Sequence, residues 1–273
     1  MNKQVVLITG ASAGIGLSLV EMLMKKGMKV YAASRRGGIN VEDAETGGQI
    51  ISVKMDVNNE AEIADVVGKI ISESNRLDAL VCNAGNGISG AVEDTLSDEA
   101  KYQFETNFFG VVKCINACLP VFRQQKQGKI MVTSSVAGVV PIPFQAFYSA
   151  SKSALLLFMN ALSLEVKPFG IQCCTVLPGD TKTEFTAARK YTERSQSTES
   201  AYYDTLKKSV GKMEHDEQNG MPPEAVAKAM ARQLAKKRMR LSVVPGLQYK
   251  LICGIYSLLP LRVKLWLVGL LYG

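Results

Sequence analysis

A tyrosine and a lysine four residues apart, Tyr148 and Lys152, have the side-chain types and spacing for proton transfer. They stand at the start of a segment whose apolar residues recur at helical spacing, and residues four apart on a helix share a face. An ammonium group beside a phenol favours the phenolate, so we expect the pKa of Tyr148 to fall below its ordinary value of about 10. A phenol tuned in this way is suited to reversible proton exchange with an alcohol or carbonyl oxygen. By itself, the pair fits a solvated helix face equally well.

A glycine-rich turn near the start of the chain has the composition of a phosphate-binding loop. Residues 5–8 are apolar and predict a buried strand, and a segment with helical periodicity begins at the third of the glycines Gly10, Gly14 and Gly16. Glycine permits a tight turn and lets the backbone approach a pyrophosphate, which the free N–H groups at the start of the helix would bind. The pattern therefore predicts a dinucleotide site, with an incidental tight turn as the alternative.

Two adjacent arginines, Arg35 and Arg36, follow the second predicted strand at residues 29–33. An enzyme that uses NAD usually has an acidic residue at this point, where it binds the adenosine ribose. Two guanidinium groups would instead bind a 2′-phosphate, and no neighbouring carboxylate would repel it. We therefore expect NADP(H) as the cofactor, the alternative being two solvated loop arginines.

Strand and helix patterns alternate over the first part of the chain. Further apolar runs predict strands at residues 49–55, 77–82 and 129–133. Asn83 and Ser135 follow two of these runs, at the edge where open α/β sheets bind their ligands. Such an alternation predicts a parallel sheet covered by helices on both faces.

The composition fits a single enzyme-sized domain. The chain has 273 residues, of which 47% are hydrophobic and 21% charged, and it has no internal repeat. Its net charge of +7 comes from dispersed basic residues without interleaved aromatic residues, which argues against nucleic-acid binding. The six cysteines lack zinc spacings, so we expect reduced core residues and no metal site. The single histidine, His215, lies in a polar stretch and is expected at the surface.

In their order and spacing these motifs resemble those of the short-chain dehydrogenase/reductase family, single-domain type. The matches are T-G-x-x-x-G-x-G at 9–16, N-A-G at 83–85, Asn107, Ser135, Y-x-x-x-K at 148–152, and P-G at 178–179 followed by Thr183. The resemblance implies a Rossmann-type, doubly wound parallel sheet of about seven strands. It also implies hydride transfer between a nicotinamide cofactor and an alcohol or carbonyl compound, and assembly into a homodimer or homotetramer.

The resemblance also implies a role for individual residues. Tyr148 would donate or accept the proton, Lys152 would lower its pKa and hold the nicotinamide ribose, Ser135 would bind the substrate oxygen, and Asn107 would support a proton relay. Cofactor contacts are implied for Gly10, Ser12, Gly14, Ile15, Gly16, Arg35, Arg36, Asp56, Val57, Asn83, Ala84, Gly85, Tyr148, Lys152, Pro178, Gly179 and Thr183. One departure from the family pattern is the unusually polar run at 180–183, which puts the contacts of that segment in doubt.

Apolar residues near the predicted site favour a bulky, hydrophobic substrate. Residues expected to contact the substrate are Ser135, Ile142, Phe144, Tyr148 and Phe185. The segments 138–148 and 167–171 resemble the hydroxysteroid and retinol dehydrogenase branch. We therefore expect a hydroxysteroid or bile acid, with a smaller or retinoid-like carbonyl compound, or a non-catalytic NADP-binding sensor or scaffold, as alternatives. A further alternative is that these apolar residues belong to the hydrophobic core and do not contact a substrate.

The composition of the chain predicts the boundaries of the domain, the lid and a C-terminal extension. Residues 1–248 are expected to form the NADP-binding domain, with a polar lid over the site at about 180–221, and residues 249–273 an apolar C-terminal extension. The first strand begins too early for a signal peptide to precede it, so a cytoplasmic location is expected. The apolar runs of the extension are too short to span a membrane, which leaves three alternatives: a cover over the site, a subunit contact or a membrane-surface segment.

Overall fold

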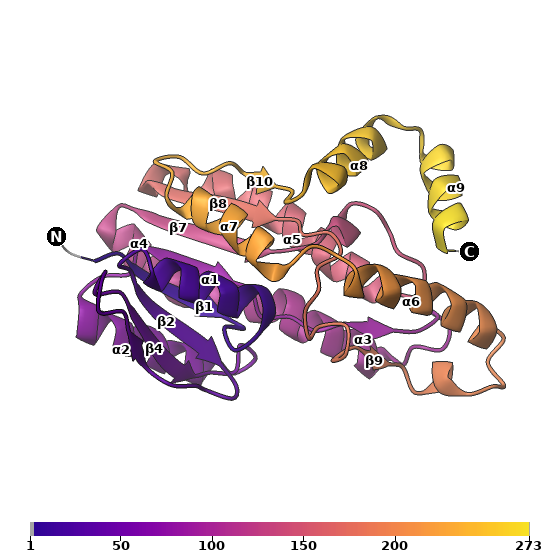
Figure 1. Ribbon diagram of the computed structural model, residues 1–273, viewed down its shortest axis with the longest axis horizontal. Coiled ribbons are helices and arrows are strands. Elements are labelled where there is room, and N and C mark those ends of the chain that lie inside the picture. The colour runs from indigo at the N-terminus through magenta and orange to yellow at the C-terminus, as the bar shows by residue number, and fades with distance from the viewer. Residues whose placement is uncertain (1–2, 273) are drawn as a thin grey trace.

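A central sheet of eight strands organises the computed structural model, which describes residues 3–272 (Figure 1). The strand order is β10-β8-β7-β5-β1-β2-β4-β3. The strands are β1 (Val5–Thr9), β2 (Lys29–Ser34), β3 (Val41–Glu42), β4 (Gln49–Lys54), β5 (Ala79–Cys82), β7 (Gly128–Thr133), β8 (Ile171–Val176) and β10 (Ser242–Val243). Among the described residues, seven of these strands run parallel, and β3 adds an antiparallel edge. The predicted Rossmann-type fold is confirmed.

Helices cover both faces of the sheet because alternate side chains of each buried strand point to opposite faces. Val5 and Leu7 of β1 pack in the cluster beneath one set of helices, whereas Val6 and Ile8 pack beneath the other. The first set is α2 (Glu60–Ser74), α4 (Gly110–Gln125) and α5 (Ala146–Glu165). The second set is α1 (Gly14–Met24) and α7 (Pro223–Leu234).

The remaining elements lie beyond the carboxyl ends of the strands or at the end of the chain. They are α3 (Ser97–Phe104), a π-helical turn η1 (Glu105–Phe109), 3-10 turns η2 (Val136–Gly138) and η4 (Arg194–Gln196), α6 (Tyr203–Gln218), a small sheet of β6 (Ile88–Ser89) and β9 (Lys190–Tyr191), α8 (Leu247–Leu258) and α9 (Leu261–Tyr272). A further 3-10 turn, η3 (Lys167–Phe169), precedes β8 at its amino end. In Figure 1, α8 and α9 form a bent pair that stands away from the sheet. Within residues 3–272, no helix is both long and apolar enough to cross a bilayer.

The histidine and five of the six cysteines lie as the sequence predicts, whereas Cys253 lies outside the core. All six cysteines are free, and five of them are buried, whereas Cys253 on α8 is half-buried. His215 is exposed near the end of α6. Residues 180–221, expected from their polarity to be a lid, include β9 and the regular helix α6.

Candidate active site

The carboxyl ends of β1, β5 and β7 meet in one hydrogen-bonded unit. The Thr9 hydroxyl accepts hydrogen bonds from the backbone N–H groups of Asn83 (3.0 Å) and Ala84 (3.1 Å). The Asn83 side chain donates to the Gly10 carbonyl (3.2 Å) and accepts from the Thr133 hydroxyl (3.2 Å). These bonds join the glycine turn and the N-A-G segment, as the spacing of the motifs predicts.

The glycine turn has the backbone shape that a dinucleotide requires. Gly10 and Gly14 have φ values of +64° and +52°, in the left-handed region that favours glycine. A Cβ at Gly16 would lie 2.2 Å from the Gly10 carbonyl oxygen, so a side chain is excluded there. The first turn of α1 has no side-chain cap, which leaves its N–H groups available to an anion. The residues present therefore fit the pyrophosphate of a nicotinamide cofactor, with Ser12 and Ile15 in the same turn.

Tyr148 and Lys152 lie on the first turns of α5, and Ser135 lies at the end of β7. The Lys152 ammonium is 5.7 Å from the centroid of the Tyr148 ring and donates a hydrogen bond to the Thr133 carbonyl (3.0 Å). The Ser135 side chain lies close enough to the Tyr148 phenol to lower its pKa, and the Ser135 hydroxyl accepts a hydrogen bond from the N–H of Ala137 (3.1 Å). The predicted trio therefore meets at the carboxyl edge of the sheet.

The pKa values of the pair depart from the sequence-based expectation. Burial raises the pKa of Tyr148 to about 12, although the neighbouring Ser135 side chain lowers it in part. Burial also lowers the pKa of Lys152 to about 8. The expectation that the neighbouring ammonium brings the pKa of Tyr148 below 10 is therefore wrong, because loss of hydration disfavours the charged form of both groups.

Asn107 lies in the π-helical turn η1, between α3 and α4, and is fully buried. Its side-chain amide donates to the Asn86 carbonyl (2.9 Å) and to Ser151 (3.4 Å), and its oxygen accepts from the Asn86 N–H (2.9 Å). π-Helical turns occur mainly at functional sites. Here the turn aims Asn107 at Gly85, where a Cβ would lie 3.2 Å from its oxygen and 3.5 Å from the Lys152 nitrogen.

The residues expected at the adenosine end lie at the strand ends but differ in accessibility. Arg35 and Arg36 are exposed after β2, and Arg36 contacts Ser12 (3.4 Å) and forms an ion pair with Glu184 (3.6 Å). The expectation that no carboxylate lies beside the two arginines is therefore wrong, because Glu184 comes from a distant part of the chain. Asp56 accepts a hydrogen bond from the N–H of Asn58 (3.0 Å). The side chain of Val57 is buried in the core beneath α2 and α4, which leaves mainly its backbone for a ligand.

The polar run after Pro178 and Gly179 is explained by the C-terminal helix α8. Tyr249 of α8 donates a hydrogen bond to the Asp180 carboxylate (3.0 Å), and a Cβ at Gly179 would lie 2.2 Å from the Tyr249 ring. Burial raises the pKa of Tyr249 to about 12 and also raises that of Asp180. Thr183 lies over the glycine turn, within 3.1 Å of the position of a Cβ at Gly14. The departure from the family pattern is thus a docking point for α8.

The residues expected to contact substrate do not all lie together. The ring of Phe185 lies beside the ring of Tyr148, with 5.6 Å between centroids. Ile142 and Phe144 instead pack against Leu206, Val210 and Met213 of α6. Phe144 has a φ of +60°, a strained conformation for a large side chain of the kind that clusters at ligand sites.

Sequence reasoning missed a buried arginine above the site. Arg189 has a side chain with no exposed surface, and it pairs with Glu217 and Glu214 of α6. Its guanidinium lies 5.8 Å from the Phe185 ring, which separates it from Tyr148. Neither local polarity nor spacing identifies this residue, because its partners lie 25 and 28 positions further along the chain.

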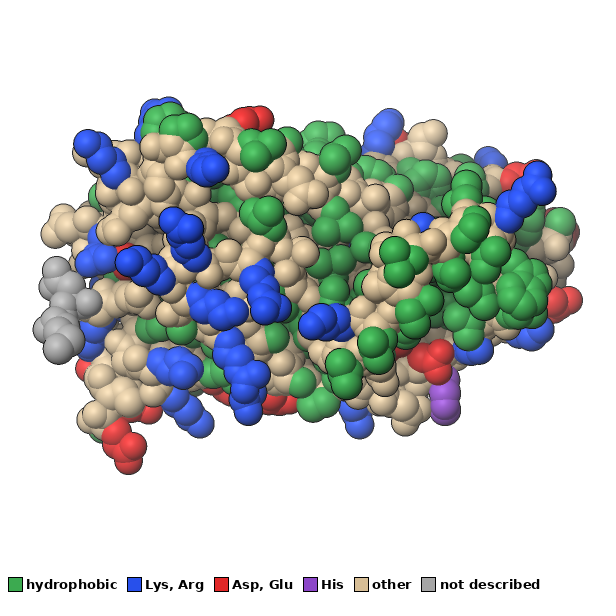
Figure 2. All heavy atoms as spheres, turned by 90° about the horizontal axis from the view of Figure 1, so that it is seen from above, with side chains coloured by type: hydrophobic (Ala, Val, Ile, Leu, Met, Phe, Trp, Pro, Cys, Tyr) green, Lys and Arg blue, Asp and Glu red, His purple; other side chains and the backbone are tan. Residues whose placement is uncertain are grey.

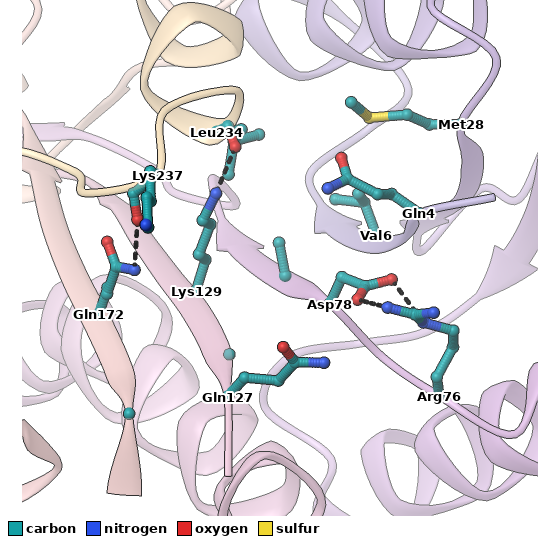
Figure 3. Close-up of a pocket in the computed structure, with 13 residues that line it drawn as sticks. Gln4, Val6, Met28, Arg76, Asp78, Gln127, Lys129, Gln172, Leu234 and Lys237 are labelled. Carbon is teal, nitrogen blue, oxygen red and sulfur yellow. Dashed lines mark hydrogen bonds and ion pairs between the residues drawn. The ribbon is translucent and has the colours of Figure 1, made fainter. Parts of the chain in front are cut away.

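A cavity of about 270 Å³ lies at the opposite edge of the sheet (Figure 3). It is lined by residues at the amino ends of the strands, among them Gln4, Asp78, Lys129 and Gln172. Lys129 donates to the carbonyls of Leu234 (2.6 Å) and Lys236 (2.8 Å), so its ammonium caps the end of α7. No predicted site residue lines this cavity.

Comparisons with known proteins agree with this geometry. Residues 4–194 match the family model for short chain dehydrogenases. The chain is 41% identical over 237 residues to a 3-ketodihydrosphingosine reductase of Bacteroides thetaiotaomicron, covering 87% of this chain and 86% of the relative. It is 37% identical over 188 residues to human retinol dehydrogenase 8, covering 66% of this chain and 60% of the relative.

A solved structure, a short-chain dehydrogenase from Streptomyces avermitilis, has the same fold over nearly the whole chain. It superposes with a TM-score of 0.79 and 27% identity, covering 93% of this chain and 92% of that one. Members of this family are oxidoreductases that bind a nicotinamide cofactor, and the glycine turn described above fits that group. Sequence, fold and site geometry agree, and the chain belongs to the short-chain dehydrogenase/reductase family.

Proposed function

We propose that the protein is an NADP(H)-dependent oxidoreductase that interconverts a secondary alcohol and a ketone on a lipid-like molecule. The observation that carries the proposal is the grouping of Ser135, Tyr148 and Lys152 at the carboxyl edge of the sheet, next to the glycine turn. A protein that only sensed NADP or served as a scaffold would not need a complete proton-transfer set beside the cofactor site. Tyr148, Lys152, Ser135 and Asn107 are the residues to which we assign the chemistry.

Each of these side chains has a distinct task in reduction. The bound nicotinamide supplies or accepts the hydride. The Ser135 hydroxyl hydrogen-bonds the substrate oxygen and stabilises the negative charge that develops on it. Tyr148 gives its proton to that oxygen, and its raised pKa keeps the phenol protonated at neutral pH. The Lys152 ammonium holds the ribose hydroxyls and lowers the pKa of the phenol as charge develops, while Asn107 positions a water for proton relay.

The preference for NADP(H) is supported by Arg35 and Arg36, both exposed at the end of β2. Charge-assisted hydrogen bonds to a phosphate contribute roughly 1.5–3 kcal/mol each, or about 10- to 100-fold in affinity. Replacing Arg36 with Ala should therefore weaken NADPH binding by at least about tenfold and leave NADH binding unchanged. Equal losses for the two cofactors would contradict the assignment.

The substrate that we favour is a long-chain 3-keto compound such as 3-ketodihydrosphingosine. It is supported by the 41% identity to a reductase named for that compound, a likeness that covers most of both chains. Phe185 offers an apolar ring next to Tyr148, where a hydrocarbon chain would lie. Residues 180–221 would act as the lid over it, since Arg189 and α6 enclose Phe185.

A hydroxysteroid or bile acid is the second candidate. It is favoured by the aromatic ring of Phe185, which presents a surface to a rigid ring system. A retinoid is a related candidate, in line with the likeness to human retinol dehydrogenase 8. The three substrate classes share a large apolar body, so the shape of the pocket near Phe185 distinguishes them.

A substrate panel tests the proposal directly. Oxidation of NADPH would be followed with 3-ketodihydrosphingosine, ketosteroids, retinal and small aliphatic ketones, with NADH in parallel. We expect the highest kcat/KM for the long-chain ketone with NADPH. Turnover confined to ketosteroids would replace the favoured substrate with the second candidate, and activity only on small ketones would overturn the lipid-like assignment.

We also propose that the protein forms a homodimer or homotetramer. Leu157 and Leu164 of α5 are exposed and lie seven residues apart, on one face of the helix. Such an apolar helix face is suited to packing against a second copy. Light scattering after size exclusion would give the mass, and Leu157→Gln combined with Leu164→Gln should reduce it to that of a monomer.

A further inference from the structure

The two C-terminal helices expose an unusual amount of apolar surface. On α8, Leu247, Leu251, Ile255 and Leu258 are all exposed and follow one face of the helix. On α9, exposed apolar side chains occur in every turn, namely Leu261, Val263, Leu265, Trp266, Leu267, Leu270 and Leu271. Soluble surfaces rarely carry a continuous apolar patch of this kind without a partner. We call this patch the α8–α9 surface.

The charge of the same region has one sign. Residues 247–272 contain three basic residues, Lys250, Arg262 and Lys264, and no acidic residue. The other basic residues of the C-terminal part, at 228–240, lie on α7 and in the loop after it, toward the opposite edge of the sheet. Figure 2 looks onto this side of the molecule and shows apolar side chains gathered at one end with a few basic side chains at the edge of that patch, most other basic side chains over the other half of the face, and acidic ones mainly at its margins. An apolar patch beside cationic residues is complementary to an anionic lipid surface.

The geometry suits a position in the plane of the membrane. Each helix has 12 residues and is therefore about 18 Å long, well short of the roughly 30 Å of a bilayer core. Pro260 separates the two helices, and the ammonium of Lys264 lies 4.9 Å from the ring centroid of Tyr256. The apolar side chains can enter the acyl boundary while Lys250 and Arg262 remain at the head groups.

The α8–α9 surface is also fastened to the candidate active site. Tyr249 of α8 covers Gly179 and donates to Asp180, at the nicotinamide end of the site. Tyr272 of α9 packs against the apolar side of α6, which also contacts Ile142 and Phe144. A membrane that held α8 and α9 would therefore lie next to the lid through which an apolar substrate must pass.

We propose that the α8–α9 surface docks on an anionic lipid bilayer as an interfacial segment that does not span it. Docking itself goes beyond the proposed function and needs no turnover. The further statement, that a lipid-like substrate passes from the bilayer to Tyr148 beneath α6, rests on the proposed function. A second copy of the chain is the other occupant that would cover the same apolar residues.

Vesicle sedimentation with the full chain tests this proposal. The probes are vesicles of phosphatidylcholine alone and of phosphatidylcholine mixed with phosphatidylglycerol. We expect at least tenfold tighter binding to the anionic vesicles at low salt, with a loss of that advantage at high salt. The Lys250→Glu, Arg262→Glu double variant should bind anionic vesicles roughly tenfold or more weakly, whereas Lys25→Glu combined with Lys26→Glu, far from this surface, should bind as the parent does.

A second pair of variants tests the apolar component. Leu258 and Trp266 have exposed fractions of 86% and 62%, and Ile39 and Val92, at 80% and 62%, provide a matched control elsewhere on the surface. Leu258→Gln combined with Trp266→Gln should weaken binding to both kinds of vesicle, and Ile39→Gln combined with Val92→Gln should not. Because the replaced residues are exposed, thermal melting curves should stay unchanged.

Three outcomes would overturn the proposal. They are the absence of vesicle binding, binding that is equal for the two lipid compositions, and a dimer that the Leu258→Gln, Trp266→Gln variant dissociates while no vesicle binding is detected. The last result would assign the surface to a second copy. Vesicle binding without turnover of any lipid-like ketone would leave docking intact and contradict the proposed function, so the two failures are distinguishable.

Discussion

The two edges of the central sheet carry half-buried and buried polar groups of similar kinds, but these groups have different partners. At the amino edge, the Asp78 carboxylate accepts a hydrogen bond from the Val5 N–H (2.7 Å) and forms an ion pair with Arg76. The Lys129 ammonium donates hydrogen bonds to the carbonyls at the end of α7. At the carboxyl edge, Lys152 is buried and Tyr148 is half-buried, and loss of hydration shifts both pKa values so that the uncharged forms are favoured.

This difference indicates that polar groups at one edge of the sheet can stabilise the fold while those at the other edge are placed for chemistry. Polar groups that satisfy one another at the amino edge hold strands and helices in register. Polar groups at the carboxyl edge lie next to a glycine turn and a helix N-terminus without a side-chain cap, a setting that is suited to binding an anionic ligand. We therefore propose that the polar groups at the amino edge serve stability and that the reaction takes place at the carboxyl edge. Four substitutions test this division.

Tyr148→Phe should have the largest effect, a loss of roughly 10²- to 10⁴-fold in kcat with NADPH binding retained, because the proton donor is removed. Steady-state kinetics and NADPH fluorescence measure the two quantities. Tyr31→Phe is the matched control, since Tyr31 is a buried tyrosine whose hydroxyl donates to Glu73 (2.7 Å), far from the site. Retained turnover in Tyr148→Phe would remove the catalytic assignment.

Arg189→Met should lower the free energy of unfolding by about 3–5 kcal/mol, because it leaves the half-buried Glu217 carboxylate without its cationic partner and with only the Thr186 hydroxyl as a donor among the described residues. Chemical denaturation gives that value, and Arg194→Met, at an exposed arginine in the same segment, should leave it within about 0.5 kcal/mol of the parent. A small effect at Arg189 would mean that residues 180–221 are not held by this ion pair.

Lys152→Met should stabilise the cofactor-free protein by on the order of 3 kcal/mol below pH 8, because it removes a buried ammonium. The free energy of the lost hydrogen bond to Thr133 reduces this gain. The pKa of Lys152 is about 8 in the folded protein and 10.5 in its ordinary state. Between these pH values the unfolded state binds more protons than the folded state, so the stability of the parent rises with pH. The advantage of the variant should therefore shrink toward pH 10.5. Unfolding titrations at several pH values measure it, and a difference independent of pH would contradict the buried ammonium.

Asp78→Ala should cost about 1–3 kcal/mol of stability and leave kcat unchanged, because the Val5 N–H loses its acceptor at the amino edge. Asp65→Ala, an exposed acidic residue on α2, provides the control. Thermal melting and turnover should be measured on the same samples. A fall in kcat at constant stability would show that the amino edge takes part in the reaction.

Much of this architecture could be predicted from the sequence because its signals are local. The strands β1, β2, β4, β5 and β7 were each expected from an apolar run within one or two residues of their bounds. Tyr148 and Lys152 were expected on one helix face, and the turn at Gly10 was expected to fit a dinucleotide. Local periodicity suffices here because strands buried on both faces and helix starts leave clear patterns.

The pKa of Tyr148 and the place of the polar run at 180–183 could not be predicted in this way. Each depends on burial or on a partner that comes from elsewhere in the chain, such as Tyr249 for Asp180. The alternatives for residues 249–273 also stayed open, because an apolar run alone does not say which of its faces is covered. The structure shows two short helices with most of their apolar side chains exposed.

The sequence by itself determined the fold class, the family and the order of the site motifs along the chain. Only the tertiary structure decided how far each side chain is removed from water and which distant groups meet, as with Arg189 and Glu217 or Asn107 and the Asn86 backbone. The physical reason is that spacing along a helix or strand fixes direction locally, whereas hydration and charge depend on every element packed around a group.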